Sequence, residues 1–139
     1  MASLVYNGGI RSALTGGIDF DTDTFKIMLV TSSYTPNEDT HLDRADVTNE
    51  VTGTGYTSGG GTTTVTVDAV DATNDRVDIN FGDVSFSNAT ITAAGGVIYK
   101  STGTASTDLL VAYLDFGGDV SSSNGTFTVS VTSPLRFAM

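Results

Sequence analysis

The sequence predicts an all-β domain, either a β-sandwich or a jelly-roll-like fold, with one short helix near the N-terminus. Apolar residues recur with a period of two in most segments after residue 20, which is the alternation of strands with one buried face. Threonine and valine are abundant, and the chain has 16 glycines but only two prolines, a mixture that favours strands joined by glycine turns. Roughly seven to nine short strands at this spacing are typical of a sandwich or barrel. No linker or internal repeat divides residues 1–139, so we expect a single domain.

Residues 3–15 are the one segment with helical spacing. Its apolar side chains, which lie four residues apart on one helical face, are Tyr6, Ile10 and Leu14. Gly16 and Gly17 form a natural C-terminal stop. The pair Gly8-Gly9 opposes the helix, because a glycine in a helix interior costs about 1 kcal/mol relative to alanine. We therefore expect a short helix or an arm over residues 3–15.

The strand from Phe25 to Val30 is apolar at both alternating sets of positions, which indicates that both of its faces are covered. In the threonine-rich segment 62–69, Val65 and Val67 alternate with threonines and predict one buried face. Further strands are expected at 77–81, 84–86, 97–99, 109–116, 127–131 and 135–137. Turn signals separate the strands at 73–75, 82–83, 103–104, 117–119 and 123–125.

The charge is strongly unbalanced, with 16 acidic residues against six lysines and arginines and a formal net charge of −10. Such a surface repels phosphate backbones, so we expect no nucleic-acid partner. It also repels other copies of the chain and keeps the free protein in solution. A hydrophobic content of 39% argues against disorder. The chain has no cysteine, and its longest apolar run, Leu109–Leu114, has six residues, so we expect no thiol chemistry, signal peptide, transmembrane helix or membrane partner.

Residues 32–61 form a long polar excursion between strands. Loops longer than about 12–15 residues are uncommon in compact domains and are often functional. A second strand-like piece lies within it at 49–51. Tyr34 and Tyr56 bracket the excursion, and we expect them to pack together beneath it as core residues. An acidic cluster that predicts a surface, or a loop that meets a partner, consists of Asp43, Asp46 and Glu50, with Arg44 among them.

The residue pattern does not favour catalysis. His41 is the only histidine, so a Ser-His-Asp arrangement would require it, yet it lies in a polar loop and no G-x-S-x-G elbow is present. Carboxylate pairs of the glycosidase kind arise by chance among 16 acids, and the chain has no tryptophan to hold a sugar ring. Gly53, Gly55 and Gly59–Gly61 lack the helix and lysine of a phosphate-binding loop, so they indicate hairpin and bend positions. We expect no enzymatic activity.

One candidate metal site has the right residue types. Asp19, Asp21 and Asp23 occupy alternate positions, which in an extended chain places three carboxylates on one side, and such oxygen ligands suit Ca²⁺. The EF-hand loop is not matched, because Thr24 stands where glycine is required and Val30 where a bidentate glutamate belongs. The alternative, which this mismatch favours, is a solvated Asp-Thr turn between the helix and the first strand. No other cofactor is expected.

Several short motifs occur together along the chain. The most specific are Tyr34-Thr35-Pro36 with Asp39-Thr40-His41, and Gly53-Thr54-Gly55-Tyr56-Thr57. The remaining pieces are 17–19 with 21–23, 26–33, 46–47 with 50–51, 75–77, 94–100 and 110–113 running into 115–117. In this combination the sequence resembles a family of small virion structural proteins encoded by tailed bacteriophages, and the resemblance spans most of the chain.

The resemblance implies a non-enzymatic virion component, and the leading expectation is a head decoration (cement) protein on the outer capsid surface. Its implied partners are the major capsid protein and further copies of itself, as a homotrimer at pseudo-threefold positions. The expected interaction residues lie in the motifs of the excursion and are Tyr34, Pro36, Asp39, His41, Gly53, Gly55 and Tyr56. The alternatives are a tail-associated or tail-fibre-associated structural or binding protein and a Ca²⁺-dependent binding module.

Overall fold

The computed structural model describes residues 2–138 and confirms the all-β expectation, with two antiparallel sheets and one short α-helix. The strands are β1 (Leu4–Val5), β2 (Phe25–Val30), β3 (Gly61–Thr63), β4 (Val65–Val67), β5 (Arg76–Phe81), β6 (Val84–Lys100), β7 (Leu110–Val129) and β8 (Leu135–Ala138). The helical elements are α1 (Asn7–Leu14) and two short 3-10 helices, η1 (Arg44–Asp46) and η2 (Ala105–Thr107).

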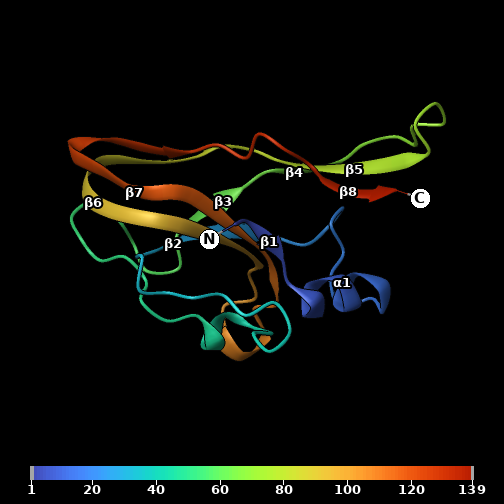
Figure 1. Cartoon of the computed structure of the whole chain (residues 1–139), viewed down its shortest axis with the longest axis horizontal. Coiled ribbons are helices and arrows are strands. Elements are labelled where there is room, and N and C mark those ends of the chain that lie inside the picture. Colours follow the sequence, from blue (N-terminus) through green and yellow to red (C-terminus); the bar gives the residue numbers. More distant parts are fainter. Residues whose placement is uncertain (1, 139) are drawn as a thin grey trace.

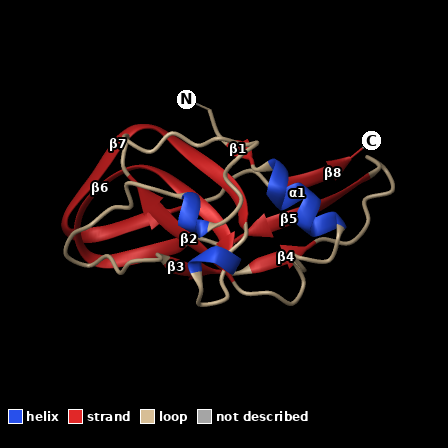
Figure 2. Ribbon diagram, turned by 90° about the horizontal axis from the view of Figure 1, so that it is seen from below, coloured by secondary structure: helices blue, strands red, loops and turns tan. Residues whose placement is uncertain are grey.

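The strands form two layers, which Figures 1 and 2 show from two directions. One sheet has five strands in the order β1-β7-β6-β2-β3, and the other has three in the order β4-β5-β8. β6 and β7 pair from Val84↔Val129 to Tyr99↔Leu110. Figure 1 shows both strands turning back on themselves at the end of the molecule opposite α1, so that they contribute to both layers. The five-stranded sheet therefore folds over at that end, and its own two long strands close the sandwich there.

This corner depends on irregular backbone within the two long strands. Register shifts interrupt the β6–β7 pairing between Phe86 and Gly95, as expected for β-bulges that bend a strand. Left-handed backbone conformations occur there at Asn88 and Asn124 and at Gly117 and Gly118. The turns predicted at 117–119 and 123–125 are therefore wrong, because both segments lie inside β7 and bend it rather than end it. The expectation of uniformly short strands also fails, since β6 has 17 residues and β7 has 20.

Other strand predictions are confirmed. β2 occupies the predicted residues, and all of its side chains except Lys26 are buried. The predicted connections at 73–75, 82–83 and 103–104 do separate strands. The segment 62–69 departs from expectation, because it is divided between β3 and β4, which belong to different sheets. There Thr63 is buried and its hydroxyl donates to the Gly82 carbonyl at 2.7 Å, whereas Val67 is 39% exposed at a sheet edge instead of buried.

The N-terminal helix is shorter than predicted. Residues 4 and 5 form strand β1, which pairs with β7, and α1 begins at Asn7. The predicted apolar face is not a buried stripe, because Leu14 is 74% exposed and Ile10 is 38% exposed. Burial of the helix instead occurs at Gly9, where an added Cβ would collide with the Leu110 carbonyl. The glycine that opposes helix formation in isolation is thus what allows α1 to lie against β7.

The buried side chains form two clusters, one on each side of the five-stranded sheet. The larger lies between the layers and includes Phe25, Ile27 and Leu29 from β2. The smaller includes Met28 and Val30, the alternate residues of β2. Since β2 alternates sides, its two sets of apolar residues require a cover on each face of the sheet. None of the helices between residues 2 and 138 is long and apolar enough to cross a membrane.

Replacing Gly9 by alanine tests the contact between α1 and β7. An alanine in an unobstructed helix would stabilise the protein, but here its methyl group meets the Leu110 carbonyl and lies 3.2 Å from Val111 Cα, neither of which is a flexible side-chain end. We expect Gly9→Ala to lower the free energy of unfolding by about 1–3 kcal/mol in urea denaturation. The matched control is Gly125→Ala, whose Cβ has ordinary contacts, and which should change stability by less than about 0.5 kcal/mol.

Candidate interaction surface

The 32–61 excursion lies against the five-stranded sheet and supplies its second cover. Tyr34 is buried in the smaller cluster, and Val47 packs against that cluster. The strand-like piece predicted at 49–51 is confirmed in limited form, as an isolated antiparallel bridge between Glu50 and Val30. Two backbone bonds flank the bridge, from Thr31 N–H to the Asn49 carbonyl and from Val51 N–H to the Leu29 carbonyl. The excursion is therefore an anchored part of the domain.

Tyr34 fixes the first half of the excursion through a chain of hydrogen bonds. Its hydroxyl lies 2.8 Å from the Tyr6 hydroxyl and 2.9 Å from His41 Nδ1. The Asn37 backbone N–H also donates to His41 Nδ1, so this nitrogen is an acceptor and the ring proton lies on Nε2. Tyr34 then donates to His41, and Tyr6 donates to Tyr34. The only histidine of the chain is thereby engaged in holding the loop to the sheet.

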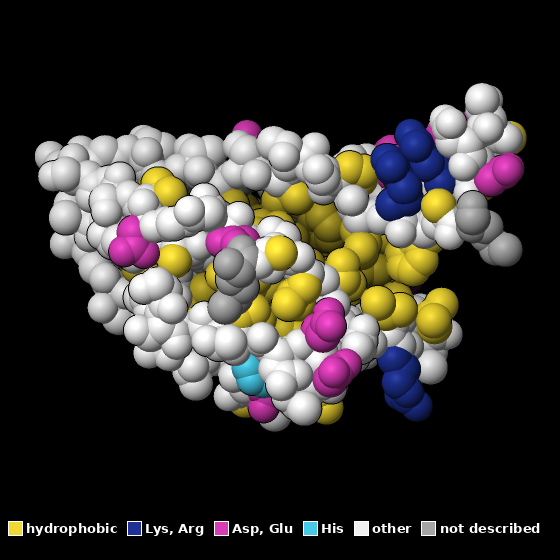
Figure 3. All heavy atoms as spheres, in the orientation of Figure 1, with side chains coloured by type: hydrophobic (Ala, Val, Ile, Leu, Met, Phe, Trp, Pro, Cys, Tyr) yellow, Lys and Arg dark blue, Asp and Glu magenta, His cyan; other side chains and the backbone are white. Residues whose placement is uncertain are grey.

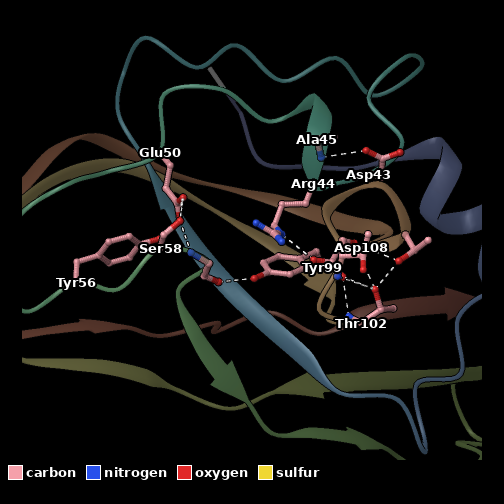
Figure 4. A network of polar contacts seen from close by, with 12 residues as sticks. Asp43, Arg44, Ala45, Glu50, Tyr56, Ser58, Tyr99, Thr102 and Asp108 are labelled. Carbon is pink, nitrogen blue, oxygen red and sulfur yellow. Dashed lines mark hydrogen bonds and ion pairs between the residues drawn. The ribbon is translucent and has the colours of Figure 1, made fainter.

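A buried ion pair fixes the middle of the excursion (Figure 4). Arg44 Nε lies 2.7 Å from the carboxylate of Asp108, which is 1% exposed. The backbone N–H and hydroxyl of Thr102 donate to the other carboxylate oxygen. Burial favours the neutral acid, but these hydrogen bonds and the Arg44 guanidinium outweigh it and hold the pKa of Asp108 below its ordinary value. Arg44 also lies 5.6 Å from the centre of the Tyr99 ring.

Glu50 organises the end of the excursion (Figure 4). Its carboxylate accepts hydrogen bonds from the Tyr56 hydroxyl at 2.6 Å, the Ser58 hydroxyl at 2.8 Å and the Gly59 backbone N–H at 2.7 Å. The Tyr56 oxygen in turn accepts from the Leu29 backbone N–H of β2 at 3.0 Å. Burial and the neighbouring carboxylate raise the pKa of Tyr56. This carboxylate belongs to an internal network and is not available as a free acidic ligand.

The glycines of the Gly-Thr-Gly-Tyr motif lie directly on β6. A Cβ at Gly53 would come within 2.6 Å of the Thr90 carbonyl oxygen, and a Cβ at Gly55 would come within 2.6 Å of Ala89 Cα. Both residues have positive φ, and the Thr90 backbone N–H donates to the Thr54 carbonyl between them. These glycines therefore act as bend positions, where the absence of a side chain lets the backbone of the excursion approach that of β6.

The structure separates the expected interaction residues by exposure. Tyr34 is 1% exposed and is used internally. Tyr56 packs against the larger cluster and contacts the Phe86 ring, so the expectation that Tyr34 and Tyr56 pack together is wrong. Pro36 and His41 are half-buried. Asp39 is exposed, but its carboxylate accepts a 2.6 Å hydrogen bond from the Asn7 side chain. Tyr34 and Tyr56 thus shape the excursion from within, and the role of this set of residues as partner contacts stays a prediction.

Asp19, Asp21 and Asp23 lie in a turn instead of an extended segment. The Asp19 carboxylate accepts from the Asp21 backbone N–H, and the Asp23 carboxylate accepts from the Asp19 backbone N–H. Asp23 also forms an ion pair with Lys100 at 3.0 Å. Within residues 2–138 no three His, Cys, Asp or Glu side chains are grouped so as to hold a metal ion. The arrangement is that of the Asp-Thr turn given as the alternative, and the Ca²⁺ hypothesis stays a prediction without geometric support.

An open apolar feature lies elsewhere, between α1 and the three-stranded sheet. It is a groove of about 760 Å³, which we call the apolar groove, and its apolar lining consists of Val5, Ile10, Val70, Ala72, Val77, Leu135, Phe137 and Ala138. A second hollow of about 370 Å³ opens between the layers beside β1 and shares Val5 and Leu135 with it. Figure 3 shows hydrophobic side chains gathered along this hollowed face.

The apolar groove is not among the sites predicted from the sequence. Its walls come from β1 and α1 on one side and from β5 and β8 on the other, segments far apart along the chain. The alternation of apolar and polar residues at 135–137 predicts a strand, but it does not indicate what the apolar face of that strand contacts. The exposed positions Ile10 and Phe137 could not be distinguished from core residues by pattern alone.

No family model, curated protein or solved structure matches this chain. The similarity of its motifs to phage virion proteins therefore remains an expectation. The functional conclusion depends on that expectation and on the surfaces that the described residues form.

The tyrosines provide a test of how tightly the excursion is held. Burial raises the pKa of each of the five tyrosines, that of Tyr99 to about 12. The hydrogen bond with Tyr34 and the neighbouring tyrosines add to the rise at Tyr6, and the Glu50 carboxylate adds to it at Tyr56. Because the folded-state values lie above the unfolded value of about 10, the stabilisation is complete below about pH 10 and is lost as the pH rises further. In a spectrophotometric titration we expect tyrosinate absorbance to stay low past pH 10 and then to appear together with unfolding. Ordinary titration near pH 10 by two or more tyrosines of the folded protein would contradict this packing.

Asp108→Asn tests the buried ion pair. The amide cannot satisfy both Arg44 and Thr102, so we expect a loss of about 2–3 kcal/mol at neutral pH. Since the folded-state pKa of Asp108 is lowered, its contribution is present above roughly pH 4 and disappears as the pH falls through that pKa. The difference between variant and wild type should therefore narrow in acid. Asp119→Asn, at an exposed residue, is the control and should change stability by less than about 0.5 kcal/mol.

Proposed function

We propose that this chain is a bacteriophage virion structural protein, a capsid decoration protein that binds and stabilises the outer surface of the head. The observation that carries the proposal is the distribution of its polar chemistry. The ionisable side chains with a specific environment, Asp108, Glu50 and His41, are engaged in internal bonds that hold the excursion. The open hollow between α1 and the three-stranded sheet is lined mainly by apolar side chains and is suited to protein contact. The resemblance of the motifs supplies the class of partner.

A rigid surface supports this proposal. The excursion is held at Tyr34 by the Tyr6 hydroxyl, at Arg44 by Asp108 just before β7, and at Glu50 by the bridge to Val30 of β2. A loop ordered before binding loses little conformational entropy when it docks, so more of its contact energy appears as affinity. A protein whose role is to fit against coat subunits benefits from this preorganisation.

The charge of the exposed loop suggests how attachment is directed. Glu38 and Asp39 are exposed residues of the excursion, beside the start of α1, in a chain with a net charge of −10. Such a surface favours a basic patch on the major capsid protein and association that weakens with salt. The net charge also limits premature aggregation of the free protein. A homotrimer is the assembly that matches threefold positions between capsomers.

Binding to purified heads that lack the protein tests the proposal. We expect the added chain to co-sediment with heads, to raise the temperature at which they release DNA, and to bind more weakly at high salt. Cryo-electron microscopy of the decorated particle should show density for this sandwich on the outer icosahedral shell. Density on the tail would favour the tail-associated alternative instead. Absence of the chain from mature particles would contradict both.

Glu38→Lys tests the direction of attachment in the same assay. The Glu38 side chain is exposed, so its reversal should leave the fold intact while reducing affinity for heads by about tenfold at low salt. Asp83→Lys, an exposed acid in the β5–β6 connection, is a control with the same charge change. Equal losses for both variants would indicate a general charge effect and would contradict docking through the excursion.

A further inference from the structure

We infer that the apolar groove is the surface through which copies of this chain associate, with a second copy covering Ile10, Val70 and Phe137. The inference concerns the protein by itself and holds whether or not the chain attaches to a capsid. It also names the contact through which the proposed trimer would form.

The groove exists because one sheet extends beyond the other. On β5 and β8 the side chains that face the interior are paired across the strands, Val77 with Phe137 and Ile79 with Leu135. Ile79 is 3% exposed, but Phe137, one step further along the same face, is 39% exposed. The apolar row therefore continues past the point where the five-stranded sheet covers it. In Figure 1 the β5–β8 end extends over α1, and Ile10 of that helix lines the opposite wall.

The exposed apolar area is of the size that a stable interface uses. Val70 is 76% exposed and Ile10 is 38% exposed, and Leu14 on the same helix as Ile10 is 74% exposed. An aromatic side chain buries roughly 150–250 Å², so the groove residues Val70, Ile10 and Phe137 leave on the order of 250 Å² open, and Leu14, which does not line the groove, adds on the order of 100 Å² on the next turn of α1. One side of a standard interface has about 800 Å², of which somewhat more than half is apolar. The groove and the adjacent Leu14 thus supply most of the apolar area that one partner needs, and the largest apolar patch of a typical monomer, about 300–600 Å², is often functional.

Charge favours a second copy as the occupant. Two chains of net charge −10 repel each other over most of their surfaces. Three of the six basic side chains, Arg11, Arg76 and Arg136, belong to α1, β5 and β8, the elements that bound the groove. Figure 3 shows Lys and Arg side chains above and below the end of the hydrophobic hollow.

The rim of the groove carries both acidic and basic side chains. Asp71 and Asp75 line it together with Arg76 and Arg136. Within one copy Arg76 already forms ion pairs with Asp71 and Asp78, and Arg136 pairs with Asp78, so the rim is largely neutralised and adds little repulsion when a second copy covers the groove. This end of the molecule is therefore where two copies approach without adding like charge.

Sedimentation velocity of the purified protein tests the inference with a matched pair of variants. Val70→Asp places a carboxylate in the groove, whereas Val120→Asp makes the same change at a 44% exposed valine of β7 that does not line it. We expect the wild type and Val120→Asp to form the same oligomer and Val70→Asp to weaken association by about 100-fold or more. Circular dichroism and thermal unfolding establish that each variant is folded, and Phe137→Ser provides a second, uncharged disruption of the same surface.

The outcomes separate this inference from the capsid proposal. A wild-type trimer that Val70→Asp dissociates supports both the groove contact and the threefold stoichiometry. A dimer that Val70→Asp dissociates supports the groove contact and contradicts the trimer. A wild type that stays monomeric at high concentration, or an oligomer unaffected by both groove variants, overturns the inference even if the protein binds heads. An oligomer that fails to bind heads leaves the groove contact standing and contradicts the proposed function.

Discussion

The structure depends on the burial of β2 from both sides. A strand with apolar residues on both faces must be covered twice, and the three-stranded sheet covers only one face of β2. The excursion provides the other cover, although its composition is polar, because it contributes Tyr34 to the smaller cluster and directs its charged groups into specific bonds. The pair of Arg44 and Asp108 is the clearest case. Since a buried carboxylate without a partner is costly, the loop is held in one position instead of lying loosely on the sheet.

Much of the fold follows from local pattern. The strand Phe25–Val30, the alternation at 77–81 and the exceptional length of the 32–61 segment could all be read from the sequence, since each is expressed in neighbouring residues. The bends in β6 and β7 could not. Glycine and asparagine supply left-handed backbone both to turns and to bulges, so Gly117 and Asn124 carry the same signal in either role.

The candidate surface was harder to predict for a different reason. When apolar residues recur at every second position, the sequence indicates that the strand has one apolar and one polar face. It does not indicate how far the opposite layer extends over the apolar face. Phe137 and Ile79 lie on the same side of one sheet, and only the reach of the other sheet leaves the first open and the second covered. Likewise, Tyr34 and His41 belong to a motif that resembles an interaction loop, yet the hydrogen bonds that hold them inward come from Tyr6, distant in sequence, and from Asn37.

The placement of β1 has a consequence for the order of events after synthesis. β1 pairs with β7, and α1 lies opposite β8, so the first and last elements of the chain form the two walls of one hollow. Contacts between such distant segments form late, because closing a long loop is entropically costly. A nascent or partly folded chain consequently lacks this contact surface altogether. Under the association that we infer, completion of folding would therefore act as a checkpoint, because only a folded chain presents the groove to a second copy.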